Sequence, residues 1–223
     1  MENQRIGIIG GTGPQGRGLA MRFARAGMEV WVGSRDESRA RETAAALNAE
    51  AGTTGIQGAG NRDVAGACRW VMLTVPFESA AETVRGLRES LRPGTVFVDV
   101  TVPLSFGKGG PFIVPLPEGS ASQHLRAIVP EGIPLLGTFK TLPAHVLDEL
   151  ETPLACDTFV FGDNAEAKAA WMDVVRRIPT LRPLDAGGLS AAPFVEGMTA
   201  LVIRLNRIAK SKEGRFRVVG ISP

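Results

Sequence analysis

A glycine-rich turn between an apolar segment and a helical pattern is the feature that most constrains how this chain can fold. Residues 6–9 form a short run with β-branched side chains, which is typical of a strand buried on both faces. The sequence G-x-G-x-x-G follows in residues 11–16, and apolar residues then recur at helical spacing until Gly27, a residue type typical of a helix C-terminus. Residues 28–32 form a second apolar run, so the pattern predicts a β-α-β unit with the glycines at its first turn.

The three glycines of this motif, Gly11, Gly13 and Gly16, have separate physical roles in such a turn. One glycine permits the tight turn, one lets the backbone approach a pyrophosphate, and one lets the helix pack closely on the strand. The start of the helix adds backbone N–H groups and a partial positive charge that favour phosphate. Because a strand, a helix and a second strand surround the motif, we predict a dinucleotide site here rather than an ordinary glycine turn.

The residues after the second predicted strand indicate which dinucleotide binds. A site for NAD usually has Asp or Glu here, whereas this chain has Ser34 and Arg35, with Arg39 one helical turn later. A hydroxyl and two guanidinium groups suit a ribose 2′-phosphate, which a carboxylate would repel. We therefore predict NADP as the cofactor. The alternative is that both arginines are solvated charges and that Asp36 and Glu37 only interact with the helix dipole.

The composition is that of an ordinary globular protein and excludes several classes. The chain has 223 residues, of which 44% are hydrophobic and 22% charged, so it is long enough for a proper core. Its formal net charge of +2 indicates neither nucleic-acid nor membrane binding. No apolar run is long enough to cross a bilayer and no signal peptide precedes the first strand, so we expect a cytoplasmic protein. Cys68 and Cys156 are expected to pack as small apolar residues.

The contents of Tyr and His narrow the chemistry further. The chain contains no Tyr, which excludes the dehydrogenases in which a Tyr hydroxyl paired with a Lys protonates a carbonyl oxygen. It contains two His residues, so a metal site built on His is not expected, and we predict no metal.

Strand and helix patterns alternate along the rest of the chain. The later predicted strands are 55–58, 70–76, 95–100, 133–139, 158–163 and 182–186, and the predicted helices are 35–51, 62–68 with Asn61 as N-cap, 77–91, 120–129 with Ser120 as cap, 164–177 and a long final helix after Gly188. This order predicts an α/β protein with a doubly wound parallel sheet. Ligands of such sheets bind beyond the carboxyl ends of the strands, where four predicted strand ends converge. These ends are residues 10–16, 34–35, 74–76 and 100–103.

Two segments fall outside this alternation. Residues 104–119 are rich in Gly and Pro, but their apolar side chains argue against disorder, so we interpret them as a substrate-side loop, with a surface connector as the alternative. The final helix carries an apolar stripe, which is expected to be core or a dimer seam. The members of the stripe are Phe194, Val195, Met198, Leu201, Val202, Leu205 and Ile208.

Several motifs make the sequence resemble the F420H2:NADP oxidoreductases, the NADPH-dependent coenzyme F420 reductases. The motifs occur in the same order as in that family and span nearly the whole chain. The matching pieces are Gly10-Gly11-Thr12-Gly13, Gly33-Ser34-Arg35, Thr74-Val75-Pro76, Val102-Pro103, Thr141-Leu142-Pro143-Ala144, Gly162-Asp163 and the segment 181–187. The resemblance implies a Rossmann-type fold in which residues 1–150 bind NADP. It also implies a small C-terminal α/β extension, residues 151–223, that completes the substrate cleft and ends in a long helix, and it implies a homodimer.

The resemblance also implies roles for individual residues. The expected contacts are Thr12, Gly13, Pro14 and Gln15 at the pyrophosphate, Ser34, Arg35 and Arg39 at the 2′-phosphate, and Val75, Ser79, Val102 and Ala144 near the nicotinamide and its ribose, with Thr74 and Pro76 beside Val75 in the cofactor site. The deazaflavin is expected to stack over the nicotinamide, close to residues 140–144 and the final helix. The family more often has His or Asn at the position of Lys140, so this residue is expected to hold an anionic group or to mark a different substrate.

Three functions are open at this point. The first is hydride transfer between NADP(H) and coenzyme F420 or a similar acceptor, in which the two rings carry the chemistry without a dedicated acid or base. The second is NADPH-dependent reduction of a small carbonyl or imine with Lys140 as acid or anchor, supported by His145 or Glu196. The third is a non-catalytic NADP-binding redox sensor. For Lys140 itself, the alternative to a functional role is a surface charge at a strand end.

Overall fold

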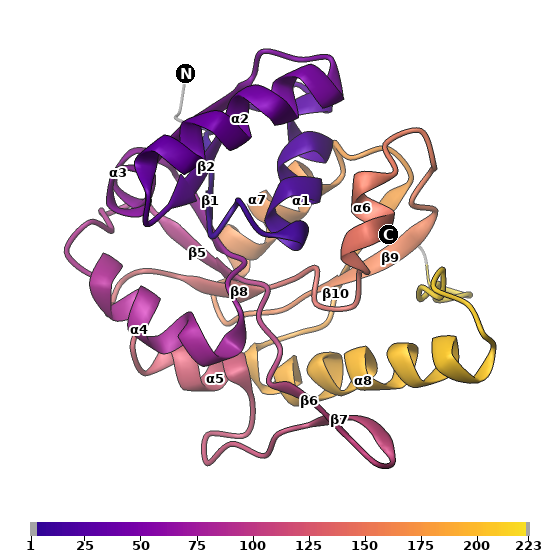
Figure 1. Cartoon of the computed structure of the whole chain (residues 1–223). Helices are drawn as coiled ribbons and strands as arrows, with labels where there is room; N and C mark the ends of the chain where they lie inside the picture. The colour runs from indigo at the N-terminus through magenta and orange to yellow at the C-terminus, as the bar shows by residue number, and fades with distance from the viewer. Residues whose placement is uncertain (1–3, 222–223) are drawn as a thin grey trace.

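The computed structural model describes residues 4–221 and has a six-stranded sheet at its centre (Figure 1). The strand order is β3-β2-β1-β4-β5-β8, and every neighbouring pair is parallel. The strands are β1 Ile6–Ile9, β2 Val30–Ser34, β3 Ile56–Gly60, β4 Trp70–Leu73, β5 Val96–Asp99 and β8 Leu135–Gly137. The chain moves outward from β1 to β3 and then crosses to β4 on the other side of β1, which confirms the predicted doubly wound parallel sheet.

Helices cover both faces of this sheet. The helices of the described residues are α1 Pro14–Arg25, α2 Glu37–Ala51, α3 Asn61–Ala67, α4 Phe77–Leu87, α5 Ala121–Arg126, α6 Ala144–Asp148, α7 Ala165–Val175 and α8 Ala192–Ile208, with a 3-10 turn at Leu189–Ala191 before α8. Because side chains alternate along a strand, β1 directs Ile6 and Ile8 toward the core formed with α1, α2 and α7, and Ile9 toward the core formed with α3, α4 and α5.

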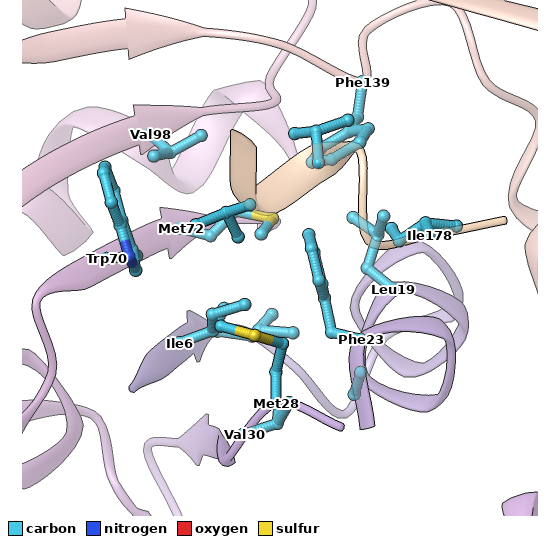
Figure 2. Packing of buried hydrophobic residues seen from close by; sticks show 14 of the residues in the cluster. Ile6, Leu19, Phe23, Met28, Val30, Trp70, Met72, Val98, Phe139 and Ile178 are labelled. Carbon is cyan, nitrogen blue, oxygen red and sulfur yellow. The ribbon is translucent and has the colours of Figure 1, made fainter. Parts of the chain in front are cut away.

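Aromatic side chains fill the larger of the two cores (Figure 2). Phe23 of α1 lies with its ring centroid 5.9 Å from that of Phe139 and 5.8 Å from that of Trp171. Trp171, from α7, in turn lies 5.0 Å from Trp70 at the start of β4. All four side chains are fully buried. Helix α7, from the C-terminal part of the chain, therefore contributes to the same core as the first helix and the central sheet.

The C-terminal segment forms its own small parallel sheet beside the large one. It consists of β9 Cys156–Val160 and β10 Leu181–Asp185, joined through α7. Gly137 of β8 and Phe161 exchange two backbone hydrogen bonds of 2.9 and 3.1 Å, which connect the two sheets. A Cβ atom at Gly137 would lie 2.0 Å from the Phe161 ring, so only glycine fits at this junction. The predicted C-terminal α/β extension with a long final helix is confirmed.

Residues 104–119 differ from the expected loop. Residues 104–113 form an antiparallel hairpin of β6 Leu104–Gly107 and β7 Gly110–Ile113, which lies beside α8 (Figure 1). The predicted substrate-side loop did not anticipate this hairpin, because glycine at Gly110, with φ of 101°, permits a tight turn that the composition alone does not reveal. The expected stripe on α8 is divided: Val195 and Val202 are buried, whereas Phe194 and Ile208 are more than 70% exposed.

The predicted N-cap role of Asn61 is also wrong. The N-cap of α3 is Gly60, and Asn61 is the first residue of the helix. Its Oδ1 is buried without a hydrogen-bond partner among the described residues, and it lies against Gly33 at the end of β2. The predicted cap at Ser120 is confirmed, since its hydroxyl accepts a hydrogen bond from the Gln123 N–H.

Two further expectations concern cysteine packing and membrane crossing. Cys68 and Cys156 are buried free thiols, as predicted, and burial raises their pKa values to about 12 and about 11. Among residues 4–221, no helix is long and apolar enough to cross a membrane. Nor do the His, Cys, Asp and Glu side chains of these residues form a group that would hold a metal ion.

Candidate active site

The glycine-rich turn lies at the carboxyl end of β1 and begins α1. Gly10 has φ of 76°, and the Gly11 N–H donates both to the Ile8 carbonyl and to the Gly33 carbonyl, each at 3.1 Å. The N-cap of α1 is Gly13 and Pro14 follows it, with no side chain capping the helix. The positive end of α1 therefore faces the crevice without an internal anion, as a phosphate-binding helix requires.

The structure explains why glycine is needed at Gly11 and Gly16. A Cβ atom at Gly16 would lie 2.6 Å from the Gly11 Cα and 2.8 Å from the Thr74 hydroxyl, and one at Gly11 would lie 2.8 Å from the Ile8 carbonyl. At Gly13 the nearest atom would be 3.4 Å away, so the protein itself leaves room there. The freedom at Gly13 is consistent with its expected role in letting a ligand approach the backbone.

The end of β2 carries the residues predicted for the 2′-phosphate. The Ser34 hydroxyl accepts a hydrogen bond from the Asp36 N–H, which leaves its own hydrogen available for a ligand oxygen. The Asp36 carboxylate caps α2 by accepting from the Arg39 N–H, so Asp36 has a structural role at this turn. Arg35 and Arg39 are exposed, and neither forms an ion pair with another described residue. Two free guanidinium groups therefore lie beside one free hydroxyl donor.

The end of β4 meets the glycine-rich turn. The Thr74 hydroxyl donates to the Ile9 carbonyl at 3.0 Å, and the Val75 side chain packs against Gly10. Pro76 is the N-cap of α4, and Ser79 lies exposed in the first turn of that helix. Val102, three residues after β5, is half-buried. The ends of β1 and β4, about 65 residues apart in sequence, are thus in direct contact.

A third segment, between β8 and α6, packs against the glycine-rich turn and α1. The Gln15 side-chain amide donates to the Phe139 carbonyl at 3.4 Å, which brings this segment against the glycine-rich turn. Ala144 is half-buried and begins α6. The buried Arg22 of α1 donates to the carbonyls of Val146 and Leu147, each at 3.0 Å, and so fixes α6 on α1. The sequence analysis missed this role of Arg22, because its partners are over 120 residues away.

Lys140 lies in this segment and is buried, so the interpretation as a surface charge was wrong. Its ammonium lies 2.7 Å from Asp99 Oδ2 at the end of β5 and 3.3 Å from Glu196 Oε1 on α8, and it also donates to the Thr101 carbonyl. The side chains of all three ionisable residues are completely inaccessible to solvent. We call Asp99, Lys140 and Glu196 the buried triad.

The two carboxylates of the buried triad have different surroundings. Asp99 accepts hydrogen bonds from the Thr101 N–H, the Thr101 hydroxyl and the Ser122 hydroxyl, in addition to the Lys140 ammonium. Glu196 accepts from two backbone N–H groups at the start of α5. Burial raises the pKa of Glu196; Lys140 opposes the shift, Asp99 adds to it, and the two N–H groups lower the pKa again without cancelling the rise.

The sequence analysis anticipated only part of this triad. Glu196, expected to support Lys140 in the alternative reaction, does contact it, but His145 is exposed and is paired with Glu213 at 3.7 Å. Asp99 was not predicted as a site residue. The available signal was a carboxylate at the end of a strand whose other residues are all apolar, since a buried acid needs a partner.

The fold and the site together define an α/β protein of the dinucleotide-binding class, with an uncapped helix at its glycine-rich turn and free cations at the end of β2. A sequence model of the family described as "NADP oxidoreductase coenzyme F420-dependent" matches residues 5–103. The F420-dependent NADP reductase of Methanothermobacter thermautotrophicus is 35% identical over 222 residues, which cover 97% of this chain and 95% of that protein. The protein of the same name from Methanocaldococcus jannaschii is 32% identical, with coverage of 97% and 99%. The chain belongs to this family.

Solved structures agree on the fold. A crystal structure from Arthrobacter sp. FB24, described as an F420-dependent NADP-reductase, matches with a TM-score of 0.79 and 23% identity over 96% of this chain and 98% of that one. An imine reductase from Streptomyces aurantiacus matches with a TM-score of 0.59 and 21% identity, over 93% of this chain and 62% of that one. Both comparisons show a shared Rossmann-type architecture.

Proposed function

We propose that this chain catalyses hydride transfer between NADP(H) and coenzyme F420, as an NADP-dependent oxidoreductase. The observation that carries the proposal is the 35% identity to an F420-dependent NADP reductase, which extends over 97% of this chain. The similarity therefore includes the α8 side of the crevice as well as the nucleotide-binding half. The crevice also has the features that a two-substrate hydride transfer needs, since three separate segments of the chain enclose it.

NADP is proposed to lie along the crevice from the end of β2 to the end of β5. The free guanidinium groups of Arg35 and Arg39 and the Ser34 hydroxyl support a 2′-phosphate at the first end. The uncapped start of α1 supports a pyrophosphate in the middle. The residues proposed to contact the cofactor are Gly11, Thr12, Gly13, Pro14, Gln15, Gly16, Ser34, Arg35, Arg39, Thr74, Val75, Pro76, Ser79, Val102 and Ala144.

The chemistry needs alignment of two rings more than it needs a reactive side chain. The hydride leaves the nicotinamide and joins the deazaflavin, and the protein aligns the rings and excludes water. Lys140 does not suit the alternative role of acid for a carbonyl or imine, because its ammonium is buried and bonded to Asp99, Glu196 and the Thr101 carbonyl. A non-catalytic sensor is not favoured either, since the relatives that cover this chain are named as reductases.

We further propose that the two parts of the chain have the separate roles expected from the sequence, and that the protein is a homodimer. Residues 1–150 bind NADP, and residues 151–223 complete the F420 side of the crevice through α8. A homodimer is supported by the outer face of α8, where Phe194, Leu201, Leu205 and Ile208 are 47–77% exposed, an apolar surface that a second copy would cover. A cytoplasmic location is proposed with this function, because NADP and F420 are intracellular substrates.

The test is an absorbance assay with purified protein, NADPH and oxidised F420. Catalytic loss of the oxidised deazaflavin absorbance is expected, and NADH in place of NADPH is expected to support much slower loss. As a control, Arg88→Ala, which changes an arginine at the C-terminal end of α4, is expected to leave the rate of F420 reduction unchanged. Binding of NADPH without any loss of F420 absorbance would contradict the proposed acceptor.

A further inference from the structure

The buried triad stands next to the crevice on two sides. The Lys140 ammonium is bonded to the Thr101 carbonyl, and the next residue, the half-buried Val102, is one of those proposed to contact the cofactor. On the other side, the neighbouring Phe139 carbonyl accepts from Gln15 of the glycine-rich turn. The nicotinamide end of a dinucleotide lies at the β4 and β5 side of such a sheet. The triad is therefore next to the part of the ligand whose charge changes in the reaction.

The charges of the triad do not balance when every group is ionised. Asp99 and Glu196 would carry two negative charges against one positive charge on Lys140, all without contact to solvent. An excess charge in such a place is costly unless a counter-charge is near, whereas protonation of one carboxylate leaves a neutral cluster. Asp99 accepts four hydrogen bonds, one from the ammonium at 2.7 Å, and so holds the fixed negative charge.

Glu196 is the member with less support for its charge. Its distance to the ammonium is longer, 3.3 Å, and the groups that face it are Lys140, Asp99 and the Ala121 and Ser122 N–H groups of α5. Burial raises its pKa, a shift in the direction that favours the protonated form. A cation placed in the crevice would favour the ionised form, because it supplies the missing counter-charge.

We propose that Glu196 is a proton-holding residue whose protonation follows the redox state of the bound nicotinamide: it holds a proton when neutral NADPH is bound and releases it when cationic NADP⁺ is bound. This inference rests on the proposed binding of NADP in the crevice. Glu196 does not contact the substrate. It is a positioning residue, because its own charge responds to the charge of the nicotinamide. Asp99 and Lys140 set the electrostatic balance that makes Glu196 responsive.

The proton count of the proposed reaction agrees with this role. Reduction of F420 by NADPH moves a hydride to the deazaflavin carbon, and a proton must join a ring nitrogen to complete the reduced acceptor. NADPH becomes NADP⁺ in the same step. One proton is thus consumed as the positive charge appears, when the N–H bond of the reduced deazaflavin forms. Breaking of the Glu196 O–H bond supplies one proton at that point; because Glu196 does not contact the substrate, this proton passes to solvent, from which the ring nitrogen takes one up. Solvent restores it after NADP⁺ is exchanged for NADPH.

The test measures protons released on binding, by calorimetric titration in two buffers with different heats of ionisation. The protein is titrated separately with NADP⁺ and with NADPH, and the difference removes contributions of the shared 2′-phosphate. We expect NADP⁺ to release a fraction of a proton relative to NADPH near neutral pH. The ratio of the two affinities is expected to change about tenfold in favour of NADP⁺ as the pH rises through the transition.

Two variants separate this role from a structural one. Glu196→Gln keeps the side-chain shape and is expected to abolish the difference in proton release while still binding both nucleotides. Glu118→Gln, which removes an exposed partner of His124, is expected to leave the difference unchanged. The wild-type pH series is decisive even where Glu196→Gln fails to fold.

Each outcome has one meaning. Equal proton release by NADP⁺ and NADPH between about pH 5 and 9 in the wild-type protein would overturn the inference while leaving the proposed function intact. A difference that persists in Glu196→Gln would assign the proton to another group and also overturn it. Absence of NADP binding would overturn the proposed function and this inference together.

Discussion

Replacing Lys140 by Met removes the ammonium from the buried triad while keeping a side chain of similar length. The ammonium lies 2.7 Å from Asp99 and 3.3 Å from Glu196, and all three side chains are inaccessible to solvent. Removing one partner of a buried ion pair costs about 3–5 kcal/mol, because the remaining charge is left without compensation. For a chain of this length each kcal/mol lowers Tm by about 2–4 °C, so we expect a Tm about 6–20 °C below that of the wild type.

Lys168→Met is the matched control for this prediction. The Lys168 ammonium lies at the same distance, 2.7 Å, from Asp185, but the Asp185 side chain is 50% exposed. A pair with a solvated partner contributes about 1 kcal/mol or less, so the expected change in Tm is at most about 4 °C. The comparison therefore tests burial, since the distance is the same in both pairs.

The pH dependence of the stability of Lys140→Met provides a second test of this prediction. In Lys140→Met the folded protein retains a proton on a buried carboxyl group that is ionised in the unfolded chain, so its stability falls as the pH rises. The deficit relative to wild type is expected to shrink as the pH is lowered from about 8 to 5, measured by thermal unfolding followed by circular dichroism. Equal losses in the two lysine variants, or a deficit that grows on acidification, would refute the reasoning.

Three other predictions follow from separate parts of the structure. Arg35→Ala and Arg39→Ala are each expected to weaken NADPH binding by about tenfold or more and to leave NADH binding unchanged, measured by fluorescence titration; a parallel loss for both nucleotides would contradict the 2′-phosphate assignment. Gly16→Ala places a Cβ atom 2.6 Å from the backbone of the turn and is expected to abolish nucleotide binding, whereas Gly86→Ala, with nothing within 4 Å, should bind normally. Burial alone would raise the pKa of Asp157, but its hydrogen bonds and the nearby arginines outweigh burial and hold the pKa of this carboxyl below its ordinary value of 3.8. Asp157 therefore stabilises the fold above the pKa of the unfolded chain, and this contribution is lost as the pH falls through the lower pKa of the folded protein. Asp157→Asn is expected to flatten the acid limb of Tm against pH, and an unchanged acid limb would exclude this role.

Most of the fold could be predicted from the sequence because its signals are local. The β-branched run before Gly11 and the helical spacing after it identify β1 and α1 without knowledge of any distant residue. Strand ends of a doubly wound sheet converge by topology, so the crevice followed from the strand order alone. The residues proposed for the 2′-phosphate could be predicted because they follow a strand at a fixed place in that unit.

The features that the sequence did not reveal depend on distant partners. Asp99 and Lys140 are 41 residues apart, and the triad forms only when α8 packs beside α5. A surface charge was therefore open as an alternative for Lys140, because nothing near it in sequence identifies its two acidic partners. The predicted N-cap at Asn61 was wrong for a related reason, because the Asn61 side-chain amide packs against Gly33 of β2, which is distant in sequence.

The most direct test of the central claim is to follow the hydride itself. NADPH carrying deuterium at the transferred position of the nicotinamide is mixed with oxidised F420 and the protein, and the reduced F420 is analysed by mass spectrometry. The account predicts that one deuterium atom appears on the reduced deazaflavin, since the two rings exchange the hydride directly. Reduced F420 without deuterium, or no reduction despite binding of both molecules, would contradict it.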